Sequence, residues 1–83
     1  MSNQNNSEKY KYIGVMSISM DNMKVISKFC GDNRQQVLNA MKGNYLMFQM
    51  VRAMDSNVVL NDMYLRETDN RTVIHISEND FKE

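Results

Sequence analysis

The sequence contains no proline and no tryptophan, and only one cysteine, one histidine and three glycines among 83 residues. A single cysteine cannot form an internal disulfide, which favours a reducing compartment. The isolated glycines form no phosphate-binding loop, and the carboxylates do not follow the spacing of a calcium or zinc site. These absences argue against most catalytic sites, so we expect a non-enzymatic binding protein without a metal or cofactor.

Long apolar runs are also missing, since none approaches the roughly 18 residues that a membrane span requires. The first seven residues, MSNQNNS, are polar and uncharged, unlike a signal peptide. We therefore expect a cytoplasmic protein with no membrane partner. Hydrophobic residues nevertheless make up 42% of the chain and include nine methionines. Methionine fills irregular cores and, on a surface, gives adaptable contacts.

Alternating β-branched and aromatic residues predict strands over 10–20, 24–30, 58–67 and 71–77. The first segment has apolar residues on both faces, which predicts a central strand. Asp21 and Asn22 supply the turn of a first hairpin.

Apolar residues at three- and four-residue steps predict a helix over 33–54, with Asp32 and Gln35 as a capping box. Gly43 leaves two alternatives, one long helix or a kink, and we favour the long helix. The fold class is therefore α+β, with a four-stranded antiparallel sheet in ββαββ order packed on one helix. We expect a disordered tail over 1–7, a single domain over 8–77 and an acidic tail over 78–83.

The ten basic and ten acidic residues are unevenly distributed along the chain. Residues 1–54 contain seven Lys or Arg and three acids, whereas residues 55–83 contain three basic residues and seven acids. The basic segment can attract phosphate, and the acidic one can compensate it within the molecule.

Basic residues interleaved with aromatic ones on a sheet are typical of single-stranded RNA binding, because cations neutralise phosphates and rings stack on bases. This pattern predicts a nucleic-acid-binding set of eleven residues. They are Lys9, Lys11, Lys24, Lys28, Arg34, Lys42, Arg52, Arg66, Arg71, Tyr10 and Tyr12. Neutral net charge argues against strong nonspecific binding.

The predicted helix contains more apolar residues than one face requires, which indicates a second surface. The candidate protein-interface residues are Met47, Phe48, Met50 and Met54. A homodimer or a host protein would bury them, and this gives an alternative function as a protein–protein inhibitor that binds no nucleic acid.

His75 and Cys30 are the remaining chemical candidates. His75 alone can serve as a general acid or base, so a metal-independent nuclease is a third, less favoured hypothesis. Cys30 precedes the predicted helix, where a thiolate would be stabilised, but we expect a buried, inert thiol.

The composition rich in Asn, Met and Lys, the MSNQNNS start and the ββαββ pattern without a catalytic motif resemble small early proteins of T-even-like tailed phages. That family includes inhibitors of host defence nucleases and toxins, among them toxin-inhibitory factors that work with RNA against an endoribonuclease toxin. The resemblance implies an anti-defence inhibitor in the host cytoplasm, with RNA or an endoribonuclease toxin as its partner.

Overall fold

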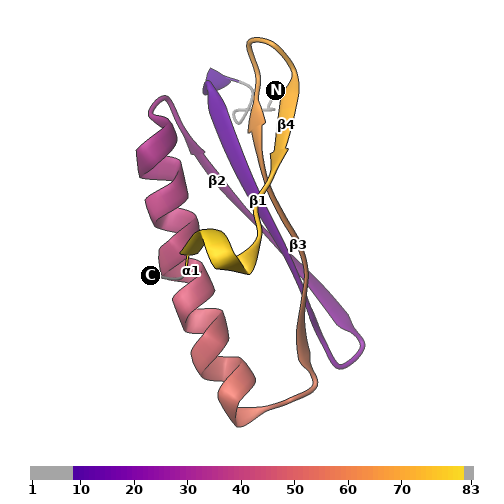
Figure 1. Ribbon diagram of the computed structural model, residues 1–83. Helices are drawn as coiled ribbons and strands as arrows, with labels where there is room; N and C mark the ends of the chain where they lie inside the picture. Colours follow the sequence, from indigo (N-terminus) through magenta and orange to yellow (C-terminus); the bar gives the residue numbers. More distant parts are fainter. Residues whose placement is uncertain (1–8, 82–83) are drawn as a thin grey trace.

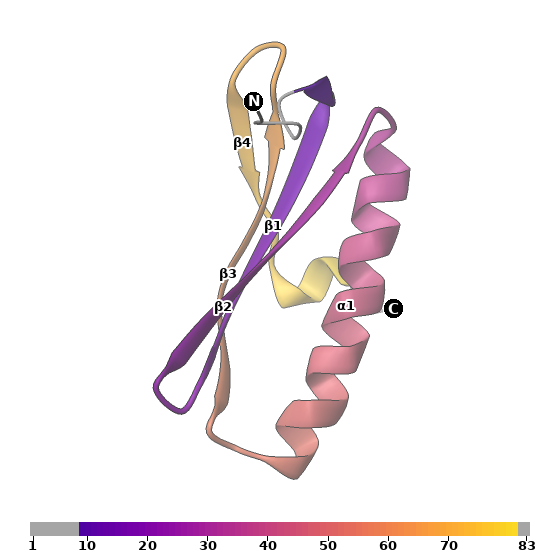
Figure 2. The same ribbon diagram turned by 180° about the vertical axis from the view of Figure 1, so that it is seen from behind.

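The computed structural model describes residues 9–81 and confirms the α+β fold, with one antiparallel sheet and one long helix on one of its faces (Figures 1 and 2). The strands are β1 (Tyr12–Met20), β2 (Met23–Gly31), β3 (Val58–Glu67) and β4 (Thr72–His75), and the long helix is α1 (Arg34–Met54). Their order in the sheet is β2-β1-β3-β4. The expected tail over 1–7 lies outside the described residues.

Strand β1 is central, as its apolar residues on both faces predict. It pairs antiparallel with β2 from Tyr12 opposite Gly31 to Met20 opposite Met23. On its other side it pairs antiparallel with β3, with a register shift between Ser17 and Ile18. The β1–β2 turn and the β3–β4 turn lie at opposite ends of the sheet (Figure 1).

Helix α1 runs without interruption through Gly43, which confirms the favoured alternative. The N-cap is Asn33, whose side chain accepts a hydrogen bond from the Gln36 amide at 3.2 Å. The prediction of Asp32 as the cap was wrong, because its carboxylate instead accepts a hydrogen bond from the backbone amide of Lys11 at 3.1 Å.

The core lies between α1 and the sheet. One helix face supplies Val37, Met41, Tyr45 and Phe48, and each of these side chains is buried. They pack with apolar side chains of β1 and β3, including Met16 and Leu65. Burial of this apolar surface is the main favourable contribution to folding.

The chain beyond β4 is not the acidic tail that the composition predicts. Residues Glu78–Phe81 form the short helix η2, and Phe81 is buried against the core beside Tyr45. Figure 1 shows η2 lying between α1 and the sheet. The packed unit therefore extends through Phe81, beyond the predicted domain boundary at residue 77.

Candidate nucleic-acid interface

The two faces of the sheet have different surroundings. A side chain at Gly14 would contact Met41 and Val37, so this face of β1 lies under α1. Successive side chains in a strand point to opposite faces, and directly paired residues share a face. The other face, which we call the open face, therefore contains the following residues of the four strands. They are Lys24, Ile26, Lys28, Cys30, Ile13, Val15, Ser17, Asp62, Tyr64, Arg66, Val73 and His75.

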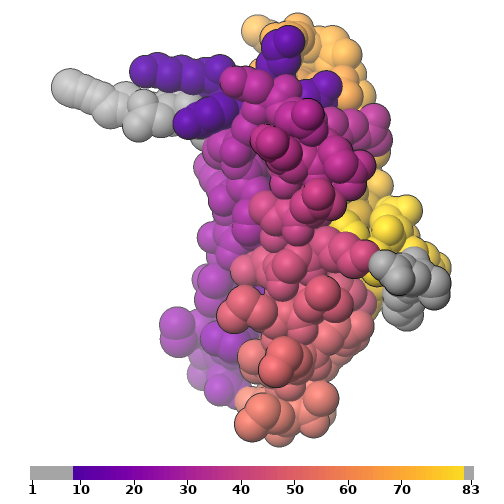
Figure 3. Space-filling model, turned by 90° about the vertical axis from the view of Figure 1, so that its left-hand side faces the viewer, coloured from indigo at the N-terminus to yellow at the C-terminus, as the bar shows by residue number. Residues whose placement is uncertain are grey.

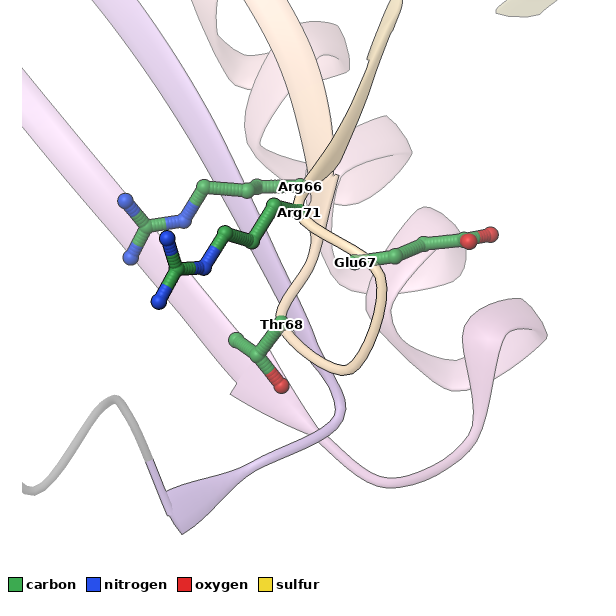
Figure 4. A pocket seen from close by; sticks show the side chains of 4 residues that line it. All are labelled: Arg66, Glu67, Thr68 and Arg71. Carbon is green, nitrogen blue, oxygen red and sulfur yellow. The ribbon is translucent and has the colours of Figure 1, made fainter.

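Arg66 and Arg71 come together where β3 turns into β4. Figure 4 shows both side chains extending in the same direction, with their guanidinium groups side by side. With Glu67 and Thr68 they line a pocket of about 410 Å³. Within residues 9–81, neither arginine side chain makes a hydrogen bond or an ion pair.

The acids near these arginines have other partners. Glu67 extends to the opposite side of the hairpin (Figure 4) and accepts a 3.0 Å hydrogen bond from Asn70. Asp62 lies 3.8 Å from Nδ1 of His75, and both side chains are largely exposed. Within residues 9–81, the donors of the two guanidinium groups are therefore free for an external anion.

The backbone holds Arg71 in an unfavourable conformation. Its φ is 57°, in the left-handed region, where glycine or asparagine is favoured. The β3–β4 turn is fixed to the start of β1, since the Thr68 hydroxyl donates to the carbonyl of Tyr10 at 2.8 Å and the Thr68 amide to that of Lys11 at 3.0 Å. The backbone segment containing Lys11 therefore lies beside the arginine turn.

A row of paired residues crosses the open face from one edge strand to the other. Lys28 is opposite Val15, Val15 is opposite Tyr64, and Tyr64 is opposite His75. Adjacent strands are about 4.8 Å apart, so Lys28 and Tyr64 are about 10 Å apart. The Tyr64 and His75 rings meet edge-on, with centroids 6.4 Å apart.

Tyr64 was missed as a site residue. The signal was present in the alternation of Asp62, Tyr64 and Arg66, which places all three on one face of β3. Tyr12, which was predicted to stack on bases, lies on the helix-facing side of β1 and packs against the core.

Three other predicted basic residues, Arg34, Lys42 and Arg52, belong to α1, on the other side of the sheet from the open face. Arg34 and Lys42, on α1, line a second pocket of about 460 Å³ together with residues of β4 and η2. Arg52 forms a 3.2 Å ion pair with Glu78 and lies over the Phe48 ring, 4.7 Å from its centroid. It thus joins α1 to η2. Lys9 and Tyr10 are exposed just before β1.

Of the four predicted protein-interface residues, three are exposed and one is buried. Met47, Met50 and Met54 are exposed on α1, by 65%, 70% and 89%. Phe48 is buried, because it points toward the sheet as part of the core. It is therefore unavailable to a partner.

His75 is one of the residues that line the second pocket, and its side chain is 77% exposed. Cys30 is exposed, so the expected burial of its thiol was wrong. Within residues 9–81, no three His, Cys, Asp or Glu side chains are grouped as metal ligands would be. Among the helices of this described part, none has the length and apolar character needed to cross a membrane.

Comparisons with protein-family models, with curated proteins and with solved structures gave no match. The functional argument therefore depends on the geometry of the chain itself.

Proposed function

We propose that this chain is a non-enzymatic binding protein that binds single-stranded RNA on the open face of its sheet. The observation that carries the proposal is the Arg66–Arg71 pair, two adjacent guanidinium groups without an acidic partner in the described part of the chain. A guanidinium is planar and presents a fork of donors that fits phosphate oxygens.

The conformation of Arg71 supports this proposal. A non-glycine residue in the left-handed region costs about 1–2 kcal/mol, and such conformations occur often at functional sites. Within residues 9–81 the Arg71 side chain makes no hydrogen bond or ion pair, so no such contact explains why an arginine occupies this left-handed position. An external phosphate would give this side chain a role.

The rest of the open face suits single-stranded nucleic acid. Lys24, Lys28 and Arg66 provide cations, and Tyr64 and His75 provide rings for base stacking. Stacking on an aromatic side chain contributes about 1–3 kcal/mol per base and is tolerant of sequence. On this face Ile13, Val15 and Ser17 of the central strand are buried, whereas Lys24, Lys28 and His75 of the edge strands are exposed. Phosphates and splayed bases of an unpaired strand can reach such edge residues.

The proposed biological role follows from the resemblance to phage proteins. The chain would act in the host cytoplasm as an inhibitor of a defence factor such as an endoribonuclease toxin, and RNA would contribute to the complex. This role needs binding and requires no catalytic residue.

The test measures fluorescence anisotropy of a labelled single-stranded RNA in EDTA at several salt concentrations. Each phosphate contact contributes about one unit to the salt slope, so Arg66→Ala combined with Arg71→Gly should weaken binding and reduce that slope by about 2. Arg34→Ala, on the helix side, is the matched control and should leave the slope unchanged. The RNA should remain intact. No binding at about 50 mM salt would exclude the proposal.

A second candidate function is protein–protein inhibition without nucleic acid. It is favoured by the exposure of Met47, Met50 and Met54. Under this alternative, Met50→Asp abolishes capture of the partner while Arg66→Ala and Arg71→Ala have no effect. Phe48→Asp is unsuitable for this test because Phe48 belongs to the core.

A further inference from the structure

The outward surface of α1 lacks charge along most of its length. The helix contains 21 residues, of which only Arg34, Lys42 and Arg52 are charged. Arg34 and Lys42 line the pocket shared with η2, and Arg52 pairs with Glu78 in η2. All three cations therefore lie on the η2 side of the helix. The solvent-facing surface of a helix normally carries charged residues, so the uncharged surface needs another explanation.

A regular stripe follows this uncharged surface at alternating steps of four and three residues. It consists of Gln36, Ala40, Gly43, Met47, Met50 and Met54, which are all exposed. We call this set the outer stripe. Steps of four and three are the spacing by which two helices pack along a common seam. Figure 3 looks onto the side of the molecule on which α1 lies in front.

Gly43 has no packing role within residues 9–81. A Cβ at this position would have no neighbour within 4 Å. Its φ is not positive, and it occupies the middle of a regular helix. Glycine there is less favourable than alanine. A close approach by a neighbouring molecule would explain it.

The outer stripe is complementary to itself in one antiparallel register. Its N-terminal half has the small residues Ala40 and Gly43, and its C-terminal half has the large residues Met47, Met50 and Met54. A twofold axis that crosses the outer stripe midway between Gly43 and Met47 places Gly43 opposite Met47 of the second copy. It also places Ala40 opposite Met50. The same axis places Gln36 opposite Met54, so no methionine of the stripe faces another methionine, and two of the three face Gly43 or Ala40.

We propose that the outer stripe is the interface of a homodimer in which two α1 helices pack antiparallel. A twofold interface uses the same patch on both copies, which this stripe permits. A parallel pair would instead place Gly43 on Gly43 and Met47 on Met47, with alternating gaps and crowding. The stripe has no cation to neutralise phosphate, which argues against RNA as the occupant. The proposal is independent of RNA binding, since the open face lies on the other side of the sheet.

Sedimentation equilibrium from a few micromolar to about 1 mM measures the self-association. Gly43→Gln is the test variant, because glutamine is a good helix former and space around this position is open. The monomer should remain folded, while the added side chain should weaken the dimer by at least about tenfold. Ala53→Gln, an exposed position outside the stripe, should leave the dimer unchanged. A wild-type chain that stays monomeric to about 1 mM, or equal effects of the two variants, would overturn the proposal.

Disulfide trapping in a Cys30→Ser background tests the register. Positions 40 and 50 are opposite each other between copies, whereas either position is about 15 Å from its own equivalent. A disulfide requires Cα atoms less than about 7 Å apart. An oxidised mixture of Ala40→Cys and Met50→Cys should therefore form a crosslinked dimer, and each variant alone should not. Crosslinking of the single variants without crosslinking of the mixture would contradict the antiparallel register.

Discussion

The hydroxyl of Tyr45, in the middle of α1, donates a 2.6 Å hydrogen bond to Oε1 of Glu78 in η2. Gln49 donates to the same hydroxyl, and Arg52 donates to both Gln49 and Glu78. This network fixes η2 against the helix and covers a buried phenol. The segment after β4 is therefore an integral part of the fold.

The first prediction concerns alkaline pH. Burial raises the pKa of Tyr45 above its usual 10.0, and the Glu78 carboxylate raises it further. Below pH 10 both folded and unfolded states are protonated, so the stabilisation is complete. As pH rises above 10, the unfolded state releases the proton first and the free energy of unfolding falls.

Tyr45→Phe tests this dependence. At pH 7 it should lose about 1–3 kcal/mol, because a hydrogen bond to a charged acceptor is removed. The difference from wild type should shrink above pH 10, as measured by urea unfolding at each pH. Tyr10→Phe, at an exposed tyrosine, is the control. A difference that stays constant across pH 10 would contradict the prediction.

The second prediction concerns Phe81, whose ring centroid lies 5.5 Å from that of Tyr45. Phe81→Ala should lower the free energy of unfolding by about 3 kcal/mol, because it removes apolar contacts and leaves a cavity. Urea denaturation measures the loss. Asn79→Ala, exposed in the same short helix, should change it by less than about 0.5 kcal/mol. Equal effects would show that η2 does not contribute to the core.

The third prediction compares two glycines with opposite surroundings. Gly14→Ala should destabilise by about 1–3 kcal/mol, since the new Cβ would press against Met41 and Val37. Gly43→Ala should stabilise by about 1 kcal/mol, because the space is open and alanine favours the helix. Thermal and urea unfolding at low micromolar concentration compare the two in the monomer. The same sign for both would contradict the close packing of Gly14 and the open space at Gly43.

The fourth prediction concerns Asp21 and Arg71, whose φ values are 54° and 57°. Replacement of either residue by glycine should stabilise the fold by about 1 kcal/mol, because the left-handed conformation then has no Cβ penalty. Only Arg71→Gly should also weaken RNA binding, since Asp21 belongs to the β1–β2 turn. That turn lies at the opposite end of the sheet from the β3–β4 turn (Figure 1). Loss of binding in both variants would indicate an indirect effect.

Local patterns predicted much of the fold. The alternation over 58–67 matched the bounds of β3, and the helix continued through Gly43 because flanking apolar residues pack on the sheet. Long-range contacts set the rest. Asp32 does not cap the helix because its carboxylate accepts a hydrogen bond from the amide of Lys11, 21 residues earlier. Phe81 was missed because the polar and acidic residues around it predict an exposed tail, whereas its ring is buried in the core.

The candidate site was predictable only in part. Alternation correctly placed Lys24 and Lys28 on one face of β2. The same rule places Tyr12 and Lys11 on opposite faces of the sheet. The expectation that the Tyr12 ring and the neighbouring cations form one binding surface was therefore wrong. The predicted strands and turn place Arg66 and Arg71 on either side of the second hairpin turn, but the residue type of Arg71 gives no signal of its left-handed backbone.

Because α1 and the open face lie on opposite sides of the sheet, a dimer formed through α1 would have two separate RNA-binding surfaces. Two copies joined through their helices would present their basic surfaces outward, away from each other. Such a dimer could hold two RNA strands at once, or two distant parts of one strand, but could not close both surfaces on the same nucleotides. Occupation of the first surface would raise the effective concentration at the second, so the protein would act as a crosslinker between RNA segments.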